Sequence, residues 1–200
     1  MSKTLSTPVG SAYYPRIDTP DTKFNPDGVY SCKLHVDEGD YNAFELTVKD
    51  IVNKAYKDEC TKRGVAKLKI APTSPIRQTD DGEYEIYAKQ VAKKDTRKGL
   101  LEFNVAVFDA KGQKLQETPK IGSGSKLKMG VEIYPYYTDL NGFGYTLRLK
   151  AVQIIDLVEY SAGDASSYGF SSEEEGYTSS GETFNNTFEK DEVQTEQAPF

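Results

Sequence analysis

The chain has 200 residues, of which 37% are hydrophobic and 28% are charged, and its formal net charge is −6. This length fits one domain with an appendage, and the balance is typical of a soluble globular protein. The first residues lack the apolar stretch of a secretory signal, and no apolar run approaches the roughly 20 residues that span a bilayer. We therefore expect a protein of the cytoplasm.

The charge is divided unequally along the chain. Residues 161–200 hold nine acidic side chains against one basic side chain, which gives −8, whereas residues 1–160 hold 24 basic and 22 acidic side chains, which gives +2. An asymmetry of this kind is typical of an acidic tail beside a body that can meet a polyanion. The sequence thus predicts a domain over 1–160 and a separate acidic tail over 161–200.

The first clear elements are a strand and a helix. Residues 29–36, VYSCKLHV, alternate between apolar and polar side chains, as a half-buried strand does, with Lys33 and His35 on the outer side. After this strand, apolar residues recur at helical spacing. Asp40 is the predicted N-cap and Gly64 the predicted end of the helix. The residues of the apolar stripe are Phe44, Val48, Ile51, Val52 and Ala55.

The remaining pattern predicts four more strands. Residues 71–82 are rich in Pro and Asp and are predicted to form a loop that ends in a turn. Segments 83–92 and 100–110 are predicted to pair, joined by the basic connection KKDTRKG, and the alternation in the second includes Leu101 and Phe103. Segments 127–137 and 145–160 are predicted to form a last hairpin around TDLNGFG. Whether SAYYPR, near the N-terminus, belongs to the same sheet is left open.

Five short strands with one helix after the first favour a particular architecture. We predict a mainly β fold, an OB-fold-like five-stranded Greek-key barrel with one inserted helix and a disordered acidic C-terminal tail. A β-sandwich with an accessory helix is the competing arrangement. Disorder is expected over 161–200 because that segment contains no Ile or Leu and one Val, so burial cannot offset the entropy of ordering.

Once the strands are phased by their apolar residues, cations and aromatic rings share the outer face. Cations contact phosphates, and tyrosine rings stack on unpaired bases whatever the sequence. The segment YYPR, with Tyr13, Tyr14 and Arg16, repeats this combination. For any single tyrosine, an ordinary exposed strand position is the alternative interpretation. The predicted nucleic-acid contacts are Tyr87, Lys89, Lys93, Lys94, Arg97, Lys98, Lys126, Lys128, Tyr134, Tyr136, Arg148 and Lys150.

Motifs of catalysis were sought without result. The sequence contains no P-loop, no GxSxG and no GxGxxG after a strand. His35 is predicted to be a surface strand residue, and Asp80 and Asp81 to be turn residues rather than metal ligands. Cys32 and Cys60 are too few for a disulfide framework or a four-ligand zinc site. We predict a protein that is not an enzyme and has no cofactor or metal.

Three stretches carry a resemblance to a known family: GVYSCKLHV, KLKMGVEIYPYYTDLNGFGYTLRLKAVQIIDLVEY and the terminal PF. With the acidic tail, they resemble the phage-encoded replicative single-stranded DNA-binding proteins. The resemblance implies a protein that coats single-stranded DNA, with little base specificity, during phage replication, recombination or repair in the cytoplasm of the infected bacterium. Alternatives left open are a virion structural or assembly β-barrel protein and an RNA-binding OB-fold protein, and homo-oligomers are also left open.

The resemblance also implies a role for the tail. In such families the tail contacts replication proteins such as polymerase and helicase-primase, and it competes with DNA for the basic face. Bacterial counterparts also end in Pro-Phe, but Gln197 and Ala198 stand here where those tails generally keep acids. The tail residues that match this role are Glu189, Asp191, Glu192, Glu196 and Phe200.

Overall fold

The computed structural model describes residues 4–97, 99–159, 176–177 and 183–184. The chain divides into two units, residues 1–161 and 162–200, and each is described by itself. The elements of the first unit are β1 (Thr4–Ser6), β2 (Gly10–Asp21), β3 (Val29–Val36), α1 (Glu38–Arg63), β4 (Ile76–Gln78), β5 (Tyr84–Val91), β6 (Lys93–Thr96), β7 (Gly99–Glu102), β8 (Ala106–Phe108), β9 (Lys126–Thr138) and β10 (Gly142–Asp156).

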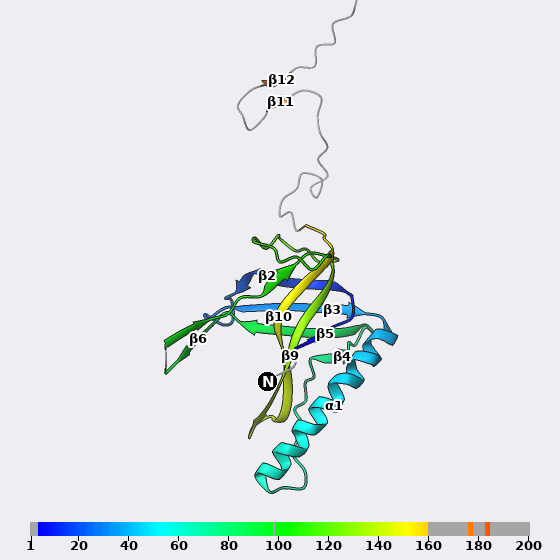
Figure 1. Cartoon of the computed structure of the whole chain (residues 1–200), viewed down its shortest axis with the longest axis vertical. Coiled ribbons are helices and arrows are strands. Elements are labelled where there is room, and N and C mark those ends of the chain that lie inside the picture. Colours follow the sequence, from blue (N-terminus) through cyan, green and yellow to red (C-terminus); the bar gives the residue numbers. More distant parts are fainter. Residues whose placement is uncertain (1–3, 98, 160–175, 178–182, 185–200) are drawn as a thin grey trace, which may run out of the picture. The chain divides into compact units, whose positions relative to one another are not determined.

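Five of these strands close into a barrel (Figure 1). They follow the order β9, β2, β3, β5, β10, and β10 pairs with β9 again to complete the ring. The pairings are antiparallel except that of β5 with β10, where Ala88 lies opposite Leu147. Short strands extend the ring: β1 pairs with β9, β4 with β5 and β8 with β10. The predicted five-stranded barrel with an inserted helix is therefore present.

The membership of the ring differs from the prediction in one strand. Segment 100–110 was predicted to be a strand paired with 83–92, but it is divided between β7, which pairs with β6, and β8, which pairs with β10 outside the ring. Leu101 is accordingly 48% exposed rather than buried. The missing fifth strand is β2, which contains SAYYPR, so the helix follows β3 rather than the first strand.

β2 escaped detection because it is irregular. It contains Pro15 and Pro20, and Tyr14 adopts the left-handed conformation with φ 46°, which non-glycine residues rarely do. Its pairing with β3 shifts register twice, between Tyr13 and Arg16 and again before Asp21. A strand interrupted in this way loses the strict alternation by which strands are recognised.

The interior of the barrel is apolar, and it confirms the predicted strand phases. The predicted inward residues of β3, β5, β9 and β10 are buried, apart from Tyr30 and Ile133, which are half-buried. The alternate side chains of these four strands therefore face outward. The buried inward residues are Cys32, Leu34, Val36, Ile86, Ala88, Leu127, Met129, Val131, Leu147 and Leu149.

The helix α1 packs against β5 and β9, with Phe44 and Val48 buried. It ends as predicted at Gly64, which adopts the left-handed conformation with φ 66° and donates its N–H to Thr61. The predicted N-cap was wrong. Asp37 precedes the first helical residue, and Asp40 lies in the first turn, where its negative charge meets the positive end of the helix dipole.

Two observations complete the description. Among the described residues, no helix is long and apolar enough to cross a bilayer. In the second unit, β11 (Gly176–Tyr177) pairs antiparallel with β12 (Thr183–Phe184). The predicted disorder of 161–200 otherwise falls outside the described residues, and the predicted domain boundary at residue 160 stays a prediction.

Candidate nucleic-acid interface

A groove of about 420 Å³ crosses the outer face of β3, β5 and β10, and the segment around β4 forms one of its walls. Two of the predicted stacking tyrosines, Tyr87 and Tyr136, line it together with the predicted phosphate contact Lys89. Lys33 and Arg77 line it as well. Segments far apart in the sequence thus bring rings and cations into one groove.

The sheet register places rings and a cation in a row. Tyr13 of β2 lies opposite Lys33 of β3, and Lys33 lies opposite Tyr87 of β5. Because neighbouring strands lie about 4.8 Å apart, the backbones of Tyr13 and Tyr87 are roughly 10 Å apart. The Lys33 ammonium lies 6.0 Å from the centre of the Tyr87 ring. The row therefore runs across the strands and toward Tyr136 at the far side of the groove.

A glycine allows the ring of Tyr136 to lie against the sheet. Tyr136 of β9 and Gly144 of β10 are register partners. A Cβ atom at position 144 would lie 2.7 Å from the Cζ and Oη atoms of Tyr136 and 2.9 Å from the Cβ of Ala71. Only a residue without a side chain leaves room for a ring this close to the backbone.

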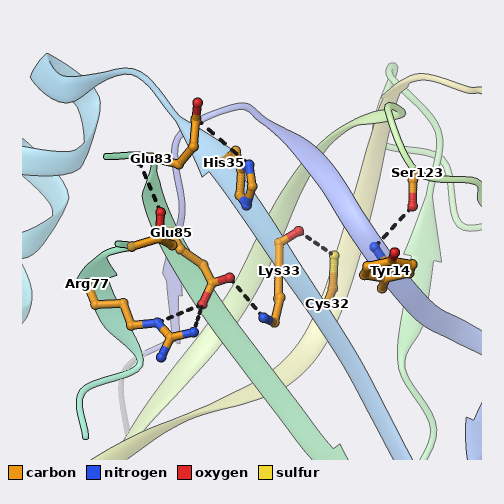
Figure 2. Close-up of polar contacts among 9 residues, drawn as sticks. Tyr14, Cys32, Lys33, His35, Arg77, Glu83, Glu85 and Ser123 are labelled. Atoms are coloured by element: carbon orange, nitrogen blue, oxygen red, sulfur yellow. Dashed lines mark hydrogen bonds and ion pairs between the residues drawn. The ribbon is translucent and has the colours of Figure 1, made fainter. Parts of the chain in front are cut away.

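The carboxylate of Glu85 holds two cations, those of Lys33 and Arg77, as Figure 2 shows. Glu85 is 3% exposed. Its Oε1 accepts a hydrogen bond from Nε of Arg77 at 3.0 Å and lies 2.9 Å from Nη2 of the same guanidinium, and its Oε2 lies 3.0 Å from Nζ of Lys33. We call these three residues the Glu85 cluster. Three segments, β3, β4 and β5, each contribute one member, so the cluster also joins the short β4 to the barrel.

A second groove, of about 560 Å³, continues the face beyond the Glu85 cluster. It is lined by Tyr13 and His35, whose rings stack with their centres 5.0 Å apart, and by all three members of the cluster. Asp80, Asp81 and Glu83 form its outer wall. The two grooves therefore meet at the cluster, with a tyrosine ring on each side of it.

The irregularity of β2 is what exposes its rings. Tyr13 is 42% and Tyr14 67% exposed, although they are consecutive in a strand. The left-handed conformation of Tyr14 turns the chain locally, and its N–H donates to Oγ of Ser123 at 3.1 Å (Figure 2). Backbone strain of this kind clusters at functional sites. The sequence signal was the YYPR segment, which was noted but not included among the predicted contacts.

Two of the tyrosines that line the first groove, Tyr87 and Tyr145, keep their protons at neutral pH. Burial raises the pKa of Tyr87 and of Tyr145, and the Tyr145 hydroxyl lies 3.0 Å from Oγ of Ser74. A phenol that keeps its proton does not repel a phosphate. The rings can therefore serve as neutral stacking surfaces beside the cations.

Two more predicted contacts, Tyr134 and Arg148, adjoin the first groove, since their register partners Thr146 and Lys89 line it. Arg148 of β10 is the register partner of Lys89 on β5, and its guanidinium lies 3.5 Å from the centre of the Tyr134 ring. Lys150 is the extra residue where the register of β9 and β10 shifts, and its Nζ lies 4.0 Å from Glu132. Tyr134 and Arg148 therefore extend the outer face along the β9–β10 hairpin.

The other predicted contacts that the structure describes line neither groove. Lys126 and Lys128 face outward near the start of β9, about 20 Å or more before Tyr134 along that strand, and Lys126 is the register partner of Ser11 on β2. Lys93, Lys94 and Arg97 belong to the β6–β7 hairpin, which Figure 1 shows on the side of the barrel opposite α1. Lys98 lies outside the described residues, as do the five predicted tail contacts.

Arg77 and Glu85 were missed by sequence reasoning. Arg77 stood in a segment interpreted as a loop, whereas it belongs to β4 and pairs with Glu85 across the sheet. Within the described part of the chain, no group of three or more His, Cys, Asp or Glu side chains is placed to hold a metal ion. The two grooves combine tyrosine rings, ammonium and guanidinium groups with the carboxylates of Glu85 and of the outer wall of the second groove.

Comparison with known proteins identifies the family. Residues 9–157 match the sequence profile of a family described as "Single-stranded DNA-binding protein, Bacteriophage T7". The chain belongs to this family. Its fold and its lack of catalytic motifs agree with membership, since the family is one of non-enzymatic proteins.

Relatives in two phages support the assignment. The single-stranded DNA-binding protein of Escherichia phage T7 is 30% identical over 175 residues, covering 78% of this chain and 74% of its own length. That of Enterobacteria phage T3 is 28% identical over 176 residues, with the same shares covered. The predicted resemblance to phage single-stranded DNA-binding proteins is thereby confirmed.

Solved structures confirm the fold. The crystal structure of gp2.5, the single-stranded DNA-binding protein of bacteriophage T7, matches with a TM-score of 0.70 and 25% identity, covering 89% of this chain and 99% of gp2.5. The single-stranded DNA-binding protein of bacteriophage Enc34, in complex with single-stranded DNA, matches with a TM-score of 0.58 and 16% identity, covering 80% and 89% of the two chains. The five-stranded ring matches the OB-fold of gp2.5, so the predicted fold class is confirmed.

Proposed function

We propose that this chain binds single-stranded DNA, with little base specificity, across the outer face of β2, β3, β5, β9 and β10. The observation that carries the proposal is the row formed by Tyr13, Lys33 and Tyr87, which continues across the groove to Tyr136. Membership of a single-stranded DNA-binding family supports it, and so does the likeness in fold to a relative solved in complex with single-stranded DNA.

On this face the tyrosine rings and the cations have different roles, which follow from their chemistry. Unpaired bases stack on tyrosine rings with roughly 1 to 3 kcal/mol each, and every base offers such a surface. Lys89 and Arg148, neighbours across β5 and β10, bind the phosphates that join the stacked bases. Recognition through stacking and phosphate contacts requires no particular base, so the binding has little sequence preference.

The test is a titration of the full chain with an oligo-dT strand of about 16 nucleotides, a length within the footprints of OB-fold proteins. Tyr87→Ala is expected to weaken binding about tenfold, as the loss of one stacked base predicts. Phe24→Ala is the matched control, because Phe24 is 88% exposed and lies in the β2–β3 loop, outside both grooves. Equal affinity of Tyr87→Ala and the wild type would show that the first groove does not bind the DNA strand.

Two further arms address the alternatives. An oligo-rU strand of the same length tests RNA, and tighter binding of RNA than of DNA would favour an RNA-binding protein. Absence of binding to either strand at low salt would favour a structural or assembly protein. Affinity for DNA is expected to fall steeply with salt, since phosphate contacts release counterions.

The proposal extends to a role in phage DNA replication, recombination or repair in the cytoplasm of the infected bacterium. Residues 161–200 carry a charge of −8. This acidic tail can occupy the cationic face, and a DNA strand of higher charge density can displace it. Displacement frees the tail acids and Phe200 for replication proteins such as polymerase and helicase-primase.

Deletion of residues 161–200 tests the competition, since the shortened chain should bind oligo-dT more tightly than the full chain. Equal affinity of the two would exclude competition. Phe200→Ala separates the binding of replication proteins from the competition with DNA, because this variant keeps the full charge of the tail. It should leave the DNA affinity unchanged and reduce the capture of replication proteins on an affinity column that carries the full chain.

A further inference from the structure

The Glu85 cluster occupies the place where the two grooves meet. Lys33, Arg77 and Glu85 line both grooves, with Tyr87 on one side and Tyr13 on the other. A strand that stacks one base on each ring must pass its connecting phosphate over the cluster. Within the cluster, Glu85 is 3% exposed, whereas the side chain of Arg77 is 51% exposed. Arg77 is therefore the member that an incoming phosphate meets.

The buried carboxylate needs an explanation, because it lowers the positive charge of an anion-binding face. Stability alone gives a weak reason, since a buried ion pair costs several kcal/mol in desolvation and is often no more stable than an apolar pair. Geometry gives a stronger one. Glu85 binds the Nε and Nη2 edge of the guanidinium, which fixes the plane of a group whose other donors can then bind a second anion.

We propose that Glu85 is a positioning residue for DNA binding, which holds the guanidinium of Arg77 in place for the phosphate that crosses between the two grooves. This inference rests on the proposed function. Lys33 is held by the other carboxylate oxygen and stays beside the ring of Tyr87. One acidic side chain thus orders both cations at the centre of the face. The Arg77 side chain loses its conformational entropy when the protein folds, so this loss does not weaken the later binding of DNA.

A positioning role and a purely electrostatic role of Glu85 predict opposite changes in DNA affinity when this carboxylate is removed. If Glu85 acted only through its charge, its removal would strengthen the attraction for DNA. If Glu85 positions Arg77, its removal weakens binding although the face becomes more positive. Glu83 provides the matched comparison: it lies two residues away, its side chain is 60% exposed, and it does not contact Arg77 among the described ion pairs.

The experiment measures the affinity of full-length variants for oligo-dT of about 16 nucleotides at one low salt concentration. Glu85→Gln is expected to bind about tenfold more weakly than the wild type, which corresponds to the loss of about one charge-assisted hydrogen bond. Glu83→Gln removes a charge from the wall of the second groove without touching Arg77, so it is expected to bind more tightly than the wild type. The double variant Glu85→Gln, Arg77→Gln should bind no more weakly than Arg77→Gln alone, because Glu85 acts through Arg77.

Three outcomes would overturn the inference: tighter binding by Glu85→Gln, equal weakening by Glu83→Gln, or additive losses in the double variant. If Glu85→Gln does not fold, as thermal melting would show, Arg77→Lys takes its place. That variant keeps the charge but loses the planar fork, so about tenfold weaker binding supports the inference and wild-type affinity overturns it. Failure of the wild type itself to bind DNA would instead refute the proposed function.

Discussion

The guanidinium of Arg148 lies over the ring of Tyr134, with 3.5 Å between the guanidinium carbon and the ring centre. The cation covers one face of the ring, so Tyr134 has a single face left for a base. A guanidinium held over a ring is also restricted in position. Arg148, beside Lys89, is thus an ordered cation at the edge of the first groove, where we propose that it binds a phosphate.

Replacing Arg148 tests this arrangement. Arg148→Ala should weaken oligo-dT binding and reduce by about one the slope of log affinity against log salt, since one phosphate contact is lost. Affinities at several salt concentrations give the slope. Lys111→Ala is the control, because Lys111 is exposed in the Asp109–Gly112 turn. An unchanged slope for Arg148→Ala would show that this cation does not reach a phosphate.

A methyl group at position 144 should disturb both the fold and the binding face. Gly144→Ala places a Cβ 2.7 Å from the ring of Tyr136, and overpacking of this kind costs roughly 1 to 3 kcal/mol in the free energy of unfolding. Oligo-dT binding should weaken as well, because the ring must move.

Gly130→Ala on the same hairpin is the matched control for Gly144→Ala. Its Cβ would meet its nearest neighbour, the Cβ of Ala151, at 3.4 Å, which is an ordinary contact. Urea unfolding and DNA titration compare the two variants. Similar stability losses in both would mean that the close approach of Tyr136 is not what restricts position 144.

The cations near the start of β9 should matter less than those in the groove. Lys128→Ala is expected to change oligo-dT affinity by less than twofold, whereas Lys89→Ala should weaken binding several-fold and lower the salt slope by about one. The two substitutions remove the same charge from outward positions on the same barrel. Equal effects would place the path of the strand along β9 rather than across β3, β5 and β10.

The thiol of Cys32 should make stability depend on alkaline pH. Burial raises the pKa of this thiol to about 12 from its ordinary value of 9.0, so the thiol loses its proton at a lower pH in the unfolded chain than in the folded one. The stabilising contribution is fully present below pH 9 and is lost as the pH rises toward 12.

Comparison of Cys32→Ala with the wild type isolates this contribution. The difference in their free energies of unfolding, measured in urea, should shrink by about 1.4 kcal/mol between pH 7.5 and pH 10. Other groups that titrate in this range are common to both proteins and cancel. A difference independent of pH would mean that the thiol ionises equally in both states.

The regular strands could be predicted from the sequence, and the irregular ones could not. In β3, β5, β9 and β10 the apolar side chains alternate because one face is buried, so their phase was evident and Tyr87, Tyr136 and Arg148 were placed correctly on the outer face. The alternation in 100–110 was equally clear, but tertiary pairing divides that segment between β7 and β8. A local pattern does not indicate which partner a strand will choose.

The Glu85 cluster, at the centre of the proposed binding face, could not be predicted from the sequence for a related reason. Arg77 and Glu85 are eight residues apart and meet because β4 folds back on β5. β4 has three residues, of which Ile76 alone is buried, so no alternation marks it as a strand. Ion pairs between short strands depend on register, and register is a property of the assembled sheet. The lysines of β6 and of the start of β9 were predicted to be contacts because of their charge, but they line neither groove.

The parallel pairing of β5 with β10 has a consequence for synthesis of the protein. Ala88 and Leu147 are partners across the ring, and β10 is the last strand of the barrel to leave the ribosome. Until it has emerged, β5 lacks its neighbour on that side, and neither Lys89 nor Tyr87 faces a completed groove. A nascent chain therefore gains its capacity to hold a strand only when translation of the barrel is essentially complete, and a product that terminates before residue 147 has no assembled binding face.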